Sequence, residues 1–374
     1  MNKKEFFIGT HRVSPPEVTW KKVKKTLPTV GVTRVADVTY LDCLGIPVTQ
    51  VIRPFSRNLS VHQGKGIDFV SSRVSAAMEA IELWHAESIS NVPFTKLSIR
   101  EMNYGNSIID DQFRWLPDAI PSKTIPIKWF QATEILSSKN AWIPAQMLEL
   151  DFTLKTHYEP PLFQKTSNGL ASGNTKEEAL LHSICELIER HALYLKAIEP
   201  ERKTMLDISS IDSTYCEHII ELINSKNLKL GVFDITWEVD IPVFFVELVS
   251  EDLPIICNGS GCHTSSEVAL LRALTEAAQS RITYIAGSRD DIIAPENPPF
   301  APFVFESYQN ENGCKFFEQV IDLCTDTIKG DLENILNRLQ SHGYRVFYID
   351  ITKECIGIPV VITYIPGLMD DPHE

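Results

Sequence analysis

The chain has 374 residues, of which 44% are apolar and 22% are charged. These values are typical of folded globular proteins, and they exclude a largely disordered or collagenous chain. Acidic residues outnumber basic ones by 49 to 35, which gives a formal net charge of −14. Duplex nucleic acid and anionic membranes both require a basic surface, so we expect neither as a partner.

The chain shows no targeting segment in its first residues. Residues 1–8 have neither the apolar core nor the small-residue cleavage site of a secretory signal. The longest uncharged apolar stretch near the other end, 356–369, contains two prolines and is shorter than the ~20 residues that span a bilayer. The eight cysteines form no CxxC pair, so we predict a reducing, cytoplasmic protein. Metal ligation by Cys257, Cys262 and His263 is one interpretation of their spacing, and scattered buried thiols are the other.

One sequence phrase occurs four times along the chain, at 37–48, 132–145, 234–243 and 350–360. In three copies an Asp-x-Thr turn is followed by Ile-Pro-Val, and the copy at 132–145 is weaker. The phrase is typical of a β-hairpin whose proline occupies the first position of the second strand, where a missing N–H is tolerated. Apolar residues at helical spacing precede two copies, at 218–228 and 332–339. The repetition predicts an internally repeated α+β fold rather than unrelated domains.

Two glycine turns each lead into a helix that carries a Glu-x-x-Glu pair. Gly66 and Gly173 both lie thirteen positions before the first glutamate of a pair. A third predicted helix, 270–282, has a similar polar pair. Residues at i and i+3 share a helix face, so the members of each pair project together. The pairs are Glu79 with Glu82, Glu186 with Glu189, and Glu276 with Gln279.

The residues around the glutamate pairs are mostly apolar or small, which predicts largely buried helices. Four unpaired carboxylates inside a fold would be very costly, so each pair must be neutralised. The candidates are a hard cation such as Mg²⁺ and the basic side chains Arg190, Arg272 and Arg281. Mg²⁺ takes oxygen ligands and completes its shell with water and substrate phosphates. Two facing pairs would form a site for several Mg²⁺ ions that binds a triphosphate. The alternative is that the two helix faces are simply exposed to solvent.

The glycine segments 63–66 and 167–175 could cradle phosphate oxygens at the start of a helix. Neither contains the Gly-Lys-Ser/Thr of a P-loop, and the chain has no GxGxxG fingerprint and no HExxH motif. An ordinary turn followed by an N-cap at Asn174 or Thr175 is the alternative interpretation.

Taken in this order, these residues resemble the YcaO family over nearly the whole chain. Segment 75–82 resembles the family's Ser-x3-Glu-x-x-Glu, segment 167–190 its central nucleotide and magnesium motif, and segment 276–291 its third motif. The resemblance implies a YcaO-type fold, with hairpin and helix units around a central ATP/Mg²⁺ site. We expect residues 1–60 to form the N-terminal part of the fold and residues 61–374 to form the YcaO domain.

The resemblance also implies roles for individual residues, and it identifies no catalytic base. Arg12 and Lys65 are added to the ATP contacts only because a phosphate site requires basic side chains. The residues implied to hold Mg²⁺ are Glu79, Glu82, Glu178, Glu186 and Glu189, and those implied to contact ATP are Ser75, Asn174, Arg190, Gln279 and Arg281.

YcaO enzymes use ATP to activate a peptide backbone amide: a nucleophile adds to the amide carbon, the amide oxygen is phosphorylated, and phosphate leaves. An internal Cys, Ser or Thr gives an azoline, external sulfide gives a thioamide, and an amide nitrogen gives an amidine. Segment 82–87, Glu-Leu-Trp-His-Ala-Glu, resembles members that work with a TfuA-like partner. The resemblance therefore implies thioamidation of a peptide or protein, with a TfuA-like sulfur-delivery protein and a homodimeric enzyme.

Two other functions stay open. An azoline-forming cyclodehydratase of ribosomal peptide biosynthesis would use the same activation, but segment 370–374 lacks the proline-rich tail of such members. A non-catalytic ATP-binding scaffold is the third hypothesis, because Leu83 stands where many members have Arg and Ala171 where some have Ser. The intact glutamate pairs argue against a scaffold. The sequence specifies neither the peptide substrate nor the modified residue.

Overall fold

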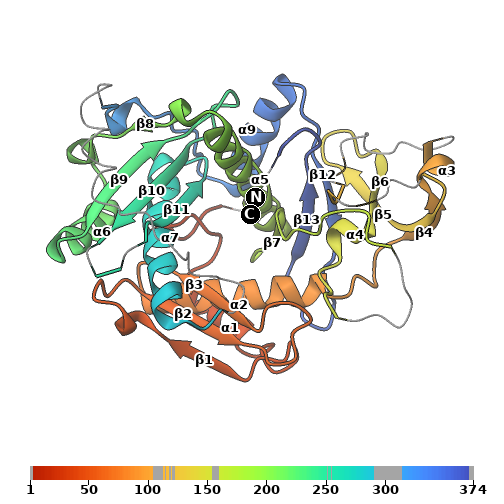
Figure 1. Cartoon of the computed structure of the whole chain (residues 1–374), viewed down its shortest axis with the longest axis horizontal. Coiled ribbons are helices and arrows are strands. Elements are labelled where there is room, and N and C mark those ends of the chain that lie inside the picture. Colours follow the sequence, from red (N-terminus) through yellow and green to blue (C-terminus); the bar gives the residue numbers. More distant parts are fainter. Residues whose placement is uncertain are drawn as a thin grey trace.

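The computed structural model describes residues 3–103, 113, 115–117, 119, 123–153, 160–250, 252–253, 255–289 and 314–369. Within these residues the chain forms three antiparallel sheets, together with long helices (Figure 1). In this view the sheets lie in the lower, left and right parts of the molecule, with α2, α5 and α7 between them. This mixed architecture confirms the predicted α+β class.

The first sheet has the strand order β1-β2-β3. Its strands are β1 (Arg34–Asp37), β2 (Val48–Ile52) and β3 (Val61–Lys65), and the accompanying helices are α1 (Pro16–Val23), η1 (Thr39–Leu41) and α2 (Phe69–Ala86). Helix α2 begins after Asp68, whose carboxylate accepts hydrogen bonds from the N–H groups of Val70 and Ser71, both at 2.8 Å. The predicted boundary between residues 60 and 61 falls between β2 and β3, which are hydrogen-bonded neighbours.

The second sheet has the order β11-β10-β9-β8. Its strands are β8 (Thr204–Met205), β9 (Lys229–Asp234), β10 (Val243–Val249) and β11 (Cys257–Cys262). The helices of this part are η2 (Pro200–Arg202), η3 (Ile208–Ser210), α6 (Thr214–Ser225), α7 (Ser266–Ala286) and η5 (Phe317–Gln319). Helix α6 contains most of the predicted helix 218–228, and α7 contains the predicted helix 270–282.

The third sheet has the order β4-β5-β12-β13-β7, with β6 paired to β5. Its strands are β4 (Phe94–Ser98), β5 (Pro126–Glu134), β6 (Asn140–Pro144), β7 (Leu170–Ser172), β12 (Phe347–Asp350) and β13 (Val360–Tyr364). The helices are α3 (Ile99–Asn103), α4 (Ala145–Leu148), α5 (Lys176–Ile198) and α9 (Ile328–Ser341), and α9 contains the predicted helix 332–339. Thr175 is the N-cap of α5, and it is one of the two residues that the sequence offered for this position.

The repeated sequence phrase forms a hairpin in all four places, namely β1–β2, β5–β6, β9–β10 and β12–β13. In three of them the threonine N–H donates to the aspartate two residues earlier, at 3.0, 2.9 and 3.1 Å. The threonine hydroxyl oxygen then accepts the N–H of the first valine of the second strand, at 3.1, 3.1 and 3.0 Å. Proline immediately precedes that valine, so its missing N–H lies outside the ladder. The weak copy differs, because Pro144 ends β6 instead of preceding it.

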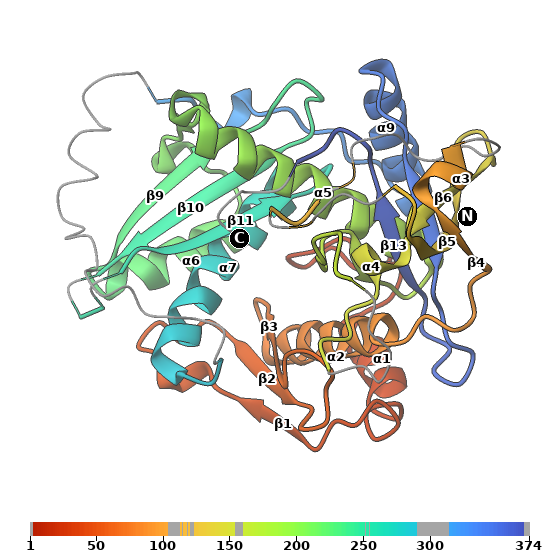
Figure 2. The same ribbon diagram turned by 45° about the vertical axis from the view of Figure 1, so that its right-hand side comes forward.

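Each sheet contributes one strand that leads directly into a long helix, giving the pairs β3–α2, β7–α5 and β11–α7. In each unit, the first valine of the hairpin's second strand pairs with the last residue of the strand that leads into the helix. The residues Lys65, Ser172 and Cys262 therefore occupy equivalent positions. The fold is therefore a threefold repeat in space. In the third unit β7 and α5 precede their hairpin β12–β13, so the copy is split along the sequence. Figure 2 shows α5 running above α2 from a second direction.

Glycine allows strand and helix to approach closely in these units. A Cβ atom at Gly64 of β3 would lie 2.0 Å from the backbone nitrogen of Ala76 in α2. At Gly261 of β11 it would lie 2.1 Å from the carbonyl oxygen of Ala269 in α7. Backbone atoms cannot yield by that much, so only glycine fits at these contacts. No helix in the described part of the chain is both long enough and apolar enough to cross a membrane.

Candidate functional site

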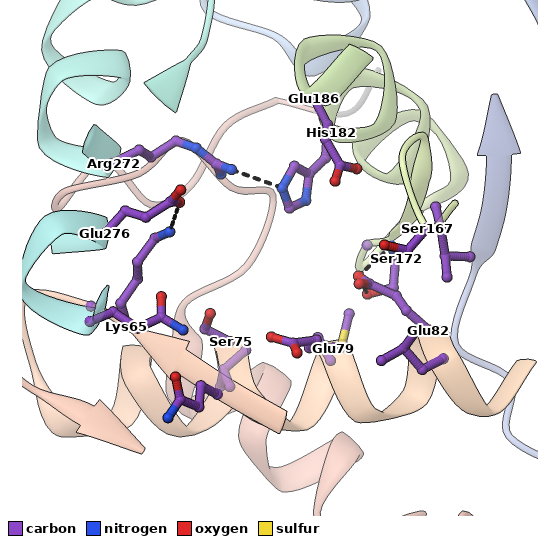
Figure 3. A pocket seen from close by; sticks show the side chains of 18 of the residues that line it. Lys65, Ser75, Glu79, Glu82, Ser167, Ser172, His182, Glu186, Arg272 and Glu276 are labelled. Carbon is purple, nitrogen blue, oxygen red and sulfur yellow. Dashed lines mark hydrogen bonds and ion pairs between the residues drawn. The ribbon is translucent and has the colours of Figure 1, made fainter. Parts of the chain in front are cut away.

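A cavity of about 1580 Å³ lies where α2, α5 and α7 face one another. Segments 6–14 and 164–168 also line it. Every predicted site residue except Arg281 contributes to its wall, although these residues come from distant parts of the sequence. Figure 3 shows the side chains of the three helices pointing toward one another across this space.

The threefold repeat explains why the polar groups converge. When positions are counted from Lys65, Ser172 and Cys262, each of the three helices has a polar residue at positions +10, +14 and +17. These positions lie on one helix face, and the three faces turn toward the same cavity. The sets are Ser75, Glu79 and Glu82 on α2; His182, Glu186 and Glu189 on α5; and Arg272, Glu276 and Gln279 on α7.

Glu82 and Glu186 lie in an environment that opposes their ionisation. Burial, and then the charges of Glu186 and Glu79, raise the pKa of Glu82 to about 8. Ser172 partly offsets this, because its N–H and hydroxyl donate to Glu82 Oε1 at 2.8 and 2.6 Å. Burial likewise raises the pKa of Glu186 to about 7, even though Arg190 lies nearby and the N–H of Gly169 donates to Glu186 Oε2 at 3.2 Å. A bound cation would restore the charged form of both groups.

The other carboxylates each have a protein neighbour. Glu79 Oε1 lies 3.8 Å from Nδ1 of the buried His62 on β3. Glu189 Oε1 accepts the hydroxyl of Ser260 on β11 at 2.7 Å. Each of these two contacts involves a single carboxylate oxygen, Oε1.

Glu276 differs from the other cavity glutamates because Lys65 forms an ion pair with it. Although burial raises the pKa of Glu276, the charges of Lys65 and Arg190 bring it below its ordinary value. The first glutamate of the third set is therefore paired with a lysine ammonium from β3, and Gln279 stands where the other two sets have a second glutamate.

Glu178 connects the beginning of the chain to α5. Its carboxylate accepts the N–H of Val13 at 2.6 Å, and the backbone and side-chain N–H groups of Asn174 at 2.8 and 3.0 Å. Thr19 donates to Asn174 Oδ1 at 2.8 Å. Glu178 and Asn174 thus hold residues 12–19 against the cavity, and this bonding brings Arg12 beside Glu178.

Basic side chains from several elements line the same cavity as the carboxylates. Burial lowers the pKa of Arg12, which Glu178 partly offsets. Arg272 Nη2 donates to His182 Nε2 at 3.1 Å. Burial, and then the charges of Arg272 and Arg12, hold the pKa of His182 well below its usual range, so this imidazole is neutral and accepts the bond. With Lys65 and Arg190, the cavity is a place where negative charge can be bound from several directions.

The structure does not bring Arg281 to the cavity. Its Nε donates to Asp42 at 2.9 Å, its Nη2 to Asp252 at 2.6 Å and its Nη1 to Ser250 at 2.6 Å. These partners lie on the side of α7 opposite to Gln279, because residues two apart on a helix do not share a face. Arg281 therefore joins α7 to the loops around it. Residues 290–291 of the third motif and the tail 370–374 lie outside the described residues.

The cysteine spacing does not produce a metal site in the described residues. Cys257 and Cys262 lie at opposite ends of β11, and all eight cysteines are free. Among the described residues, only His11, His263 and Asp331 form a group of three potential ligands whose ligand atoms lie within 4.8 Å of one another, and the cavity glutamates lie further apart than that. The ammonium of buried Lys4 already bonds two of these groups, at 2.7 Å from Asp331 and 3.1 Å from His11. Four cysteines are buried and four are exposed, which agrees with scattered thiols.

Sequence reasoning missed several residues that line the cavity or bond to its glutamates. His182 lies four positions before Glu186, so helical spacing alone would have placed it on the glutamate face. Ser172 and Ser260 gave no such signal, because their contacts with Glu82 and Glu189 depend on how strands pack against helices. Gln63 on β3 was noticed only as part of a glycine segment, and it lines the cavity with a buried side chain.

A family model described as YcaO cyclodehydratase, ATP- and Mg²⁺-binding, matches residues 63–369, which is more than half of the chain. The chain belongs to the YcaO family. This confirms the resemblance inferred from the glutamate motifs, and it confirms ATP and Mg²⁺ as the predicted cofactors. The YcaO match begins within β3, at the first of the three strand–helix pairs that form the cavity.

Two relatives of this YcaO chain are uncharacterised bacterial proteins. One, in the tfuA 3′ region of Rhizobium leguminosarum bv. trifolii, is 34% identical over 390 residues, covering 96% of this chain and 89% of the relative. The other, from Mycobacterium tuberculosis, is 37% identical over 288 residues, covering 76% of this chain and 64% of the relative. The YcaO chain therefore spans less than two thirds of the length of the mycobacterial protein.

Two solved structures share the fold. YcaO from Methanopyrus kandleri, bound with AMPPCP and Mg²⁺, superposes with a TM-score of 0.75 at 20% identity, covering 98% of this chain and 95% of that one. A heterocyclase in complex with substrate and cofactor gives a TM-score of 0.82 at 21% identity, covering 99% of this chain and 54% of that one. This YcaO chain thus corresponds to about half of the heterocyclase, and the similarity confirms the predicted YcaO-type fold.

Proposed function

We propose that this chain is an ATP-dependent enzyme that phosphorylates the oxygen of a peptide backbone amide and thereby converts the amide to a thioamide with a TfuA-like sulfur-delivery partner. The observation that carries the proposal is the convergence of three equivalent helix faces on one cavity. Six carboxylates and the basic groups Arg12, Lys65, Arg190 and Arg272 meet there. Carboxylates alone would repel a triphosphate, and basic groups alone would leave Mg²⁺ without ligands, so both kinds are needed.

The pairs on α2 and α5 are the proposed Mg²⁺ ligands, namely Glu79, Glu82, Glu186 and Glu189. The raised pKa values of Glu82 and Glu186 fit this role, because burial opposes the ionisation of both groups more than their protein neighbours favour it. Bound Mg²⁺ would offset the charge that develops on the transferring phosphoryl group. Glu178 is a weaker ligand candidate than the sequence implied, since its carboxylate already accepts three N–H groups.

The third helix supplies a fixed cation instead of a third metal site. Glu276 orients the Lys65 ammonium, and Arg272 is oriented by its bond to the neutral His182. Together with Arg12 and Ser75, these groups are the proposed phosphate contacts. Because Lys65 and Arg272 are held before ligand arrives, little reorganisation is needed when the nucleotide binds.

The proposed reaction balances as follows. Sulfide adds to the amide carbon, the amide oxygen takes the γ-phosphoryl group of ATP, and phosphate then leaves as the C=S bond forms. The products are a thioamide, ADP and phosphate. A peptide amide oxygen is a poor leaving group, and phosphorylation removes this obstacle. The bacterial relative in the tfuA 3′ region supports the sulfur-delivery partner.

A second candidate function is azoline formation, favoured by the fold similarity to a heterocyclase in complex with substrate and cofactor. Mass spectrometry of a modified peptide distinguishes the two: thioamidation exchanges oxygen for sulfur, whereas azoline formation removes one water. The assay contains ATP, Mg²⁺, a sulfide source and the candidate peptide, with and without the TfuA-like protein.

Calorimetric titration with AMPPCP tests the nucleotide site before any substrate is known. We expect the wild-type protein to bind AMPPCP in the micromolar range with Mg²⁺, about −8 kcal/mol, and much more weakly without it. Glu186→Ala and Glu189→Ala should abolish the Mg²⁺-dependent binding. Glu221→Ala, on the exposed side of α6, is the matched control and should bind normally. Normal binding by the Glu186 and Glu189 variants would refute the metal assignment.

A further inference from the structure

His62, on β3, is a fully buried histidine whose ring makes no hydrogen bond. Neither of its ring nitrogens has a hydrogen-bond partner in the part of the chain that the structure describes. Its Nδ1 lies 3.8 Å from Oε1 of Glu79, which is close but beyond the length of a hydrogen bond. Buried polar atoms without a partner are uncommon and costly in folded proteins, so this imidazole requires an explanation.

His62 approaches Glu79 from behind the cavity wall. His62 and Gly64 lie two residues apart on β3, so they share one face of the strand. Gly64 packs against the backbone of Ala76 in α2, one turn before Glu79, and His62 faces the same helix. The side chain of Glu79 is 36% exposed and lines the cavity (Figure 3), whereas His62 is not among the lining residues. The imidazole can therefore hold the carboxylate without touching a ligand in the cavity.

The other three proposed Mg²⁺ ligands each accept a hydrogen bond from a residue in or beside a strand of the repeated units. The pairs are Ser172 with Glu82, Gly169 with Glu186, and Ser260 with Glu189. Hydrogen bonds of this kind orient a metal-binding carboxylate and fix its rotamer. Among the described residues, no such bond reaches Glu79, so the set of four lacks one donor.

The threefold repeat places His62 where one of these donors lies. When positions are counted from the last strand residue of each unit, as above, Gly169 and His62 are both at −3, and Glu186 and Glu79 are both at +14. In the unit of β7 and α5, the N–H of Gly169 donates to Glu186 at 3.2 Å. In the unit of β3 and α2, the equivalent contact joins the imidazole to the equivalent glutamate.

We infer that His62 is a positioning residue for Mg²⁺ binding, and that its Nδ1–H donates to Oε1 of Glu79 when the ion is bound. This inference rests on the proposed function, because it takes Glu79 as a Mg²⁺ ligand. A hydrogen bond of this type is about 3 Å long, so the carboxylate has to move by only about 1 Å. That movement gives His62 its missing partner and restricts Glu79 to one orientation.

The test measures how much free Mg²⁺ the whole protein needs in order to bind AMPPCP. Calorimetric titrations with AMPPCP are repeated over a series of free Mg²⁺ concentrations. His62→Leu should need at least about tenfold more free Mg²⁺ than the wild type to reach half of the Mg²⁺-dependent gain in affinity. Its stability to urea without divalent ions should not fall, because an apolar group replaces an unpaired polar one. A merely structural role would not weaken Mg²⁺ binding while leaving stability intact.

Two further variants identify the nitrogen that acts. His62→Asn places an amide nitrogen near the position of Nδ1 and should return the Mg²⁺ requirement toward that of the wild type. His62→Gln places the amide near Nε2 and should behave like His62→Leu. His85→Leu is the matched control, since His85 is also a fully buried histidine next to Glu79, on α2, and is not among the cavity-lining residues. This control should bind AMPPCP and Mg²⁺ like the wild type.

Three results would overturn the inference while leaving the ATP site intact. They are an unchanged Mg²⁺ requirement in His62→Leu, a requirement in His62→Asn as high as in His62→Leu, and an equal rise in the His85→Leu control. If the wild type itself binds AMPPCP with no dependence on Mg²⁺, Glu79 is not a metal ligand, and the proposed function fails together with the inference.

Discussion

We expect Glu82→Gln to stabilise the ligand-free protein at alkaline pH. Burial, together with the charges of Glu186 and Glu79, raises the pKa of Glu82 from 4.5 to about 8. A carboxyl group whose pKa is raised in the folded state opposes folding once it ionises. Glu82 therefore has no effect on the free energy of unfolding below about pH 4.5. Between about pH 4.5 and pH 8 it lowers this free energy progressively. A glutamine stays neutral over this range and can still accept both bonds from Ser172.

The size of the effect follows from the shift. One pKa unit corresponds to about 1.4 kcal/mol, so the rise of Glu82 to about 8 sets an upper limit of about 5 kcal/mol. The carboxylate lines a cavity that admits water, which reduces the penalty of burial. We therefore expect Glu82→Gln to raise the free energy of unfolding by about 2 kcal/mol at pH 8.5 and by less than about 0.5 kcal/mol at pH 5.

Urea unfolding of both proteins at pH 5 and pH 8.5, with divalent ions removed by chelation, measures this difference. Glu221→Gln on the exposed side of α6 serves as the control for a change of surface charge. Adding Mg²⁺ with AMPPCP should then stabilise the wild type more than Glu82→Gln, because a ligand stabilises the state that binds it. The reasoning is refuted if Glu82→Gln is no more stable than wild type at pH 8.5, or if its gain is the same at both pH values.

Two substitutions test what the structure assigns outside the cavity. Arg281→Met should lower the free energy of unfolding by about 3–5 kcal/mol, because Asp42 is left buried without its partner; any folded fraction should still bind AMPPCP with Mg²⁺, and loss of binding in a fully folded variant would contradict the structural role. Gly64→Ala should cost at least about 1–3 kcal/mol, because the added Cβ would lie 2.0 Å from the backbone nitrogen of Ala76. Thermal unfolding measures this loss. An unchanged melting temperature would contradict the prediction, because it would mean that β3 and α2 can move apart without cost.

Local features of the sequence were read correctly where their cause is local. The Asp-x-Thr turns and the following prolines predicted three hairpins, because the bonds of Thr39, Thr236 and Thr352 involve residues within ten positions. The prediction that Pro144 begins the second strand of the weak copy was wrong, because Pro144 ends β6. Helix spacing likewise predicted the shared faces of the glutamate pairs.

For Arg281, the same local rule would have corrected what the resemblance implied. The resemblance grouped Arg281 with Gln279, but residues two apart point to different sides of a helix. Arg281 bonds to Asp42 and Asp252 instead of facing the cavity. Helical periodicity, applied to α7 alone, would have separated the two residues.

By itself, the sequence determined which residues share a turn or a helix face, and its motifs identified the YcaO family and its cofactors. Only the tertiary structure decided that Lys65 pairs with Glu276, that Ser172 binds Glu82 and that Glu178 holds Val13. These contacts join residues that are 90 to more than 200 positions apart. No local pattern encodes such distances, because the three units form one cavity only when the split third copy, β7–α5 with β12–β13, assembles beside the other two.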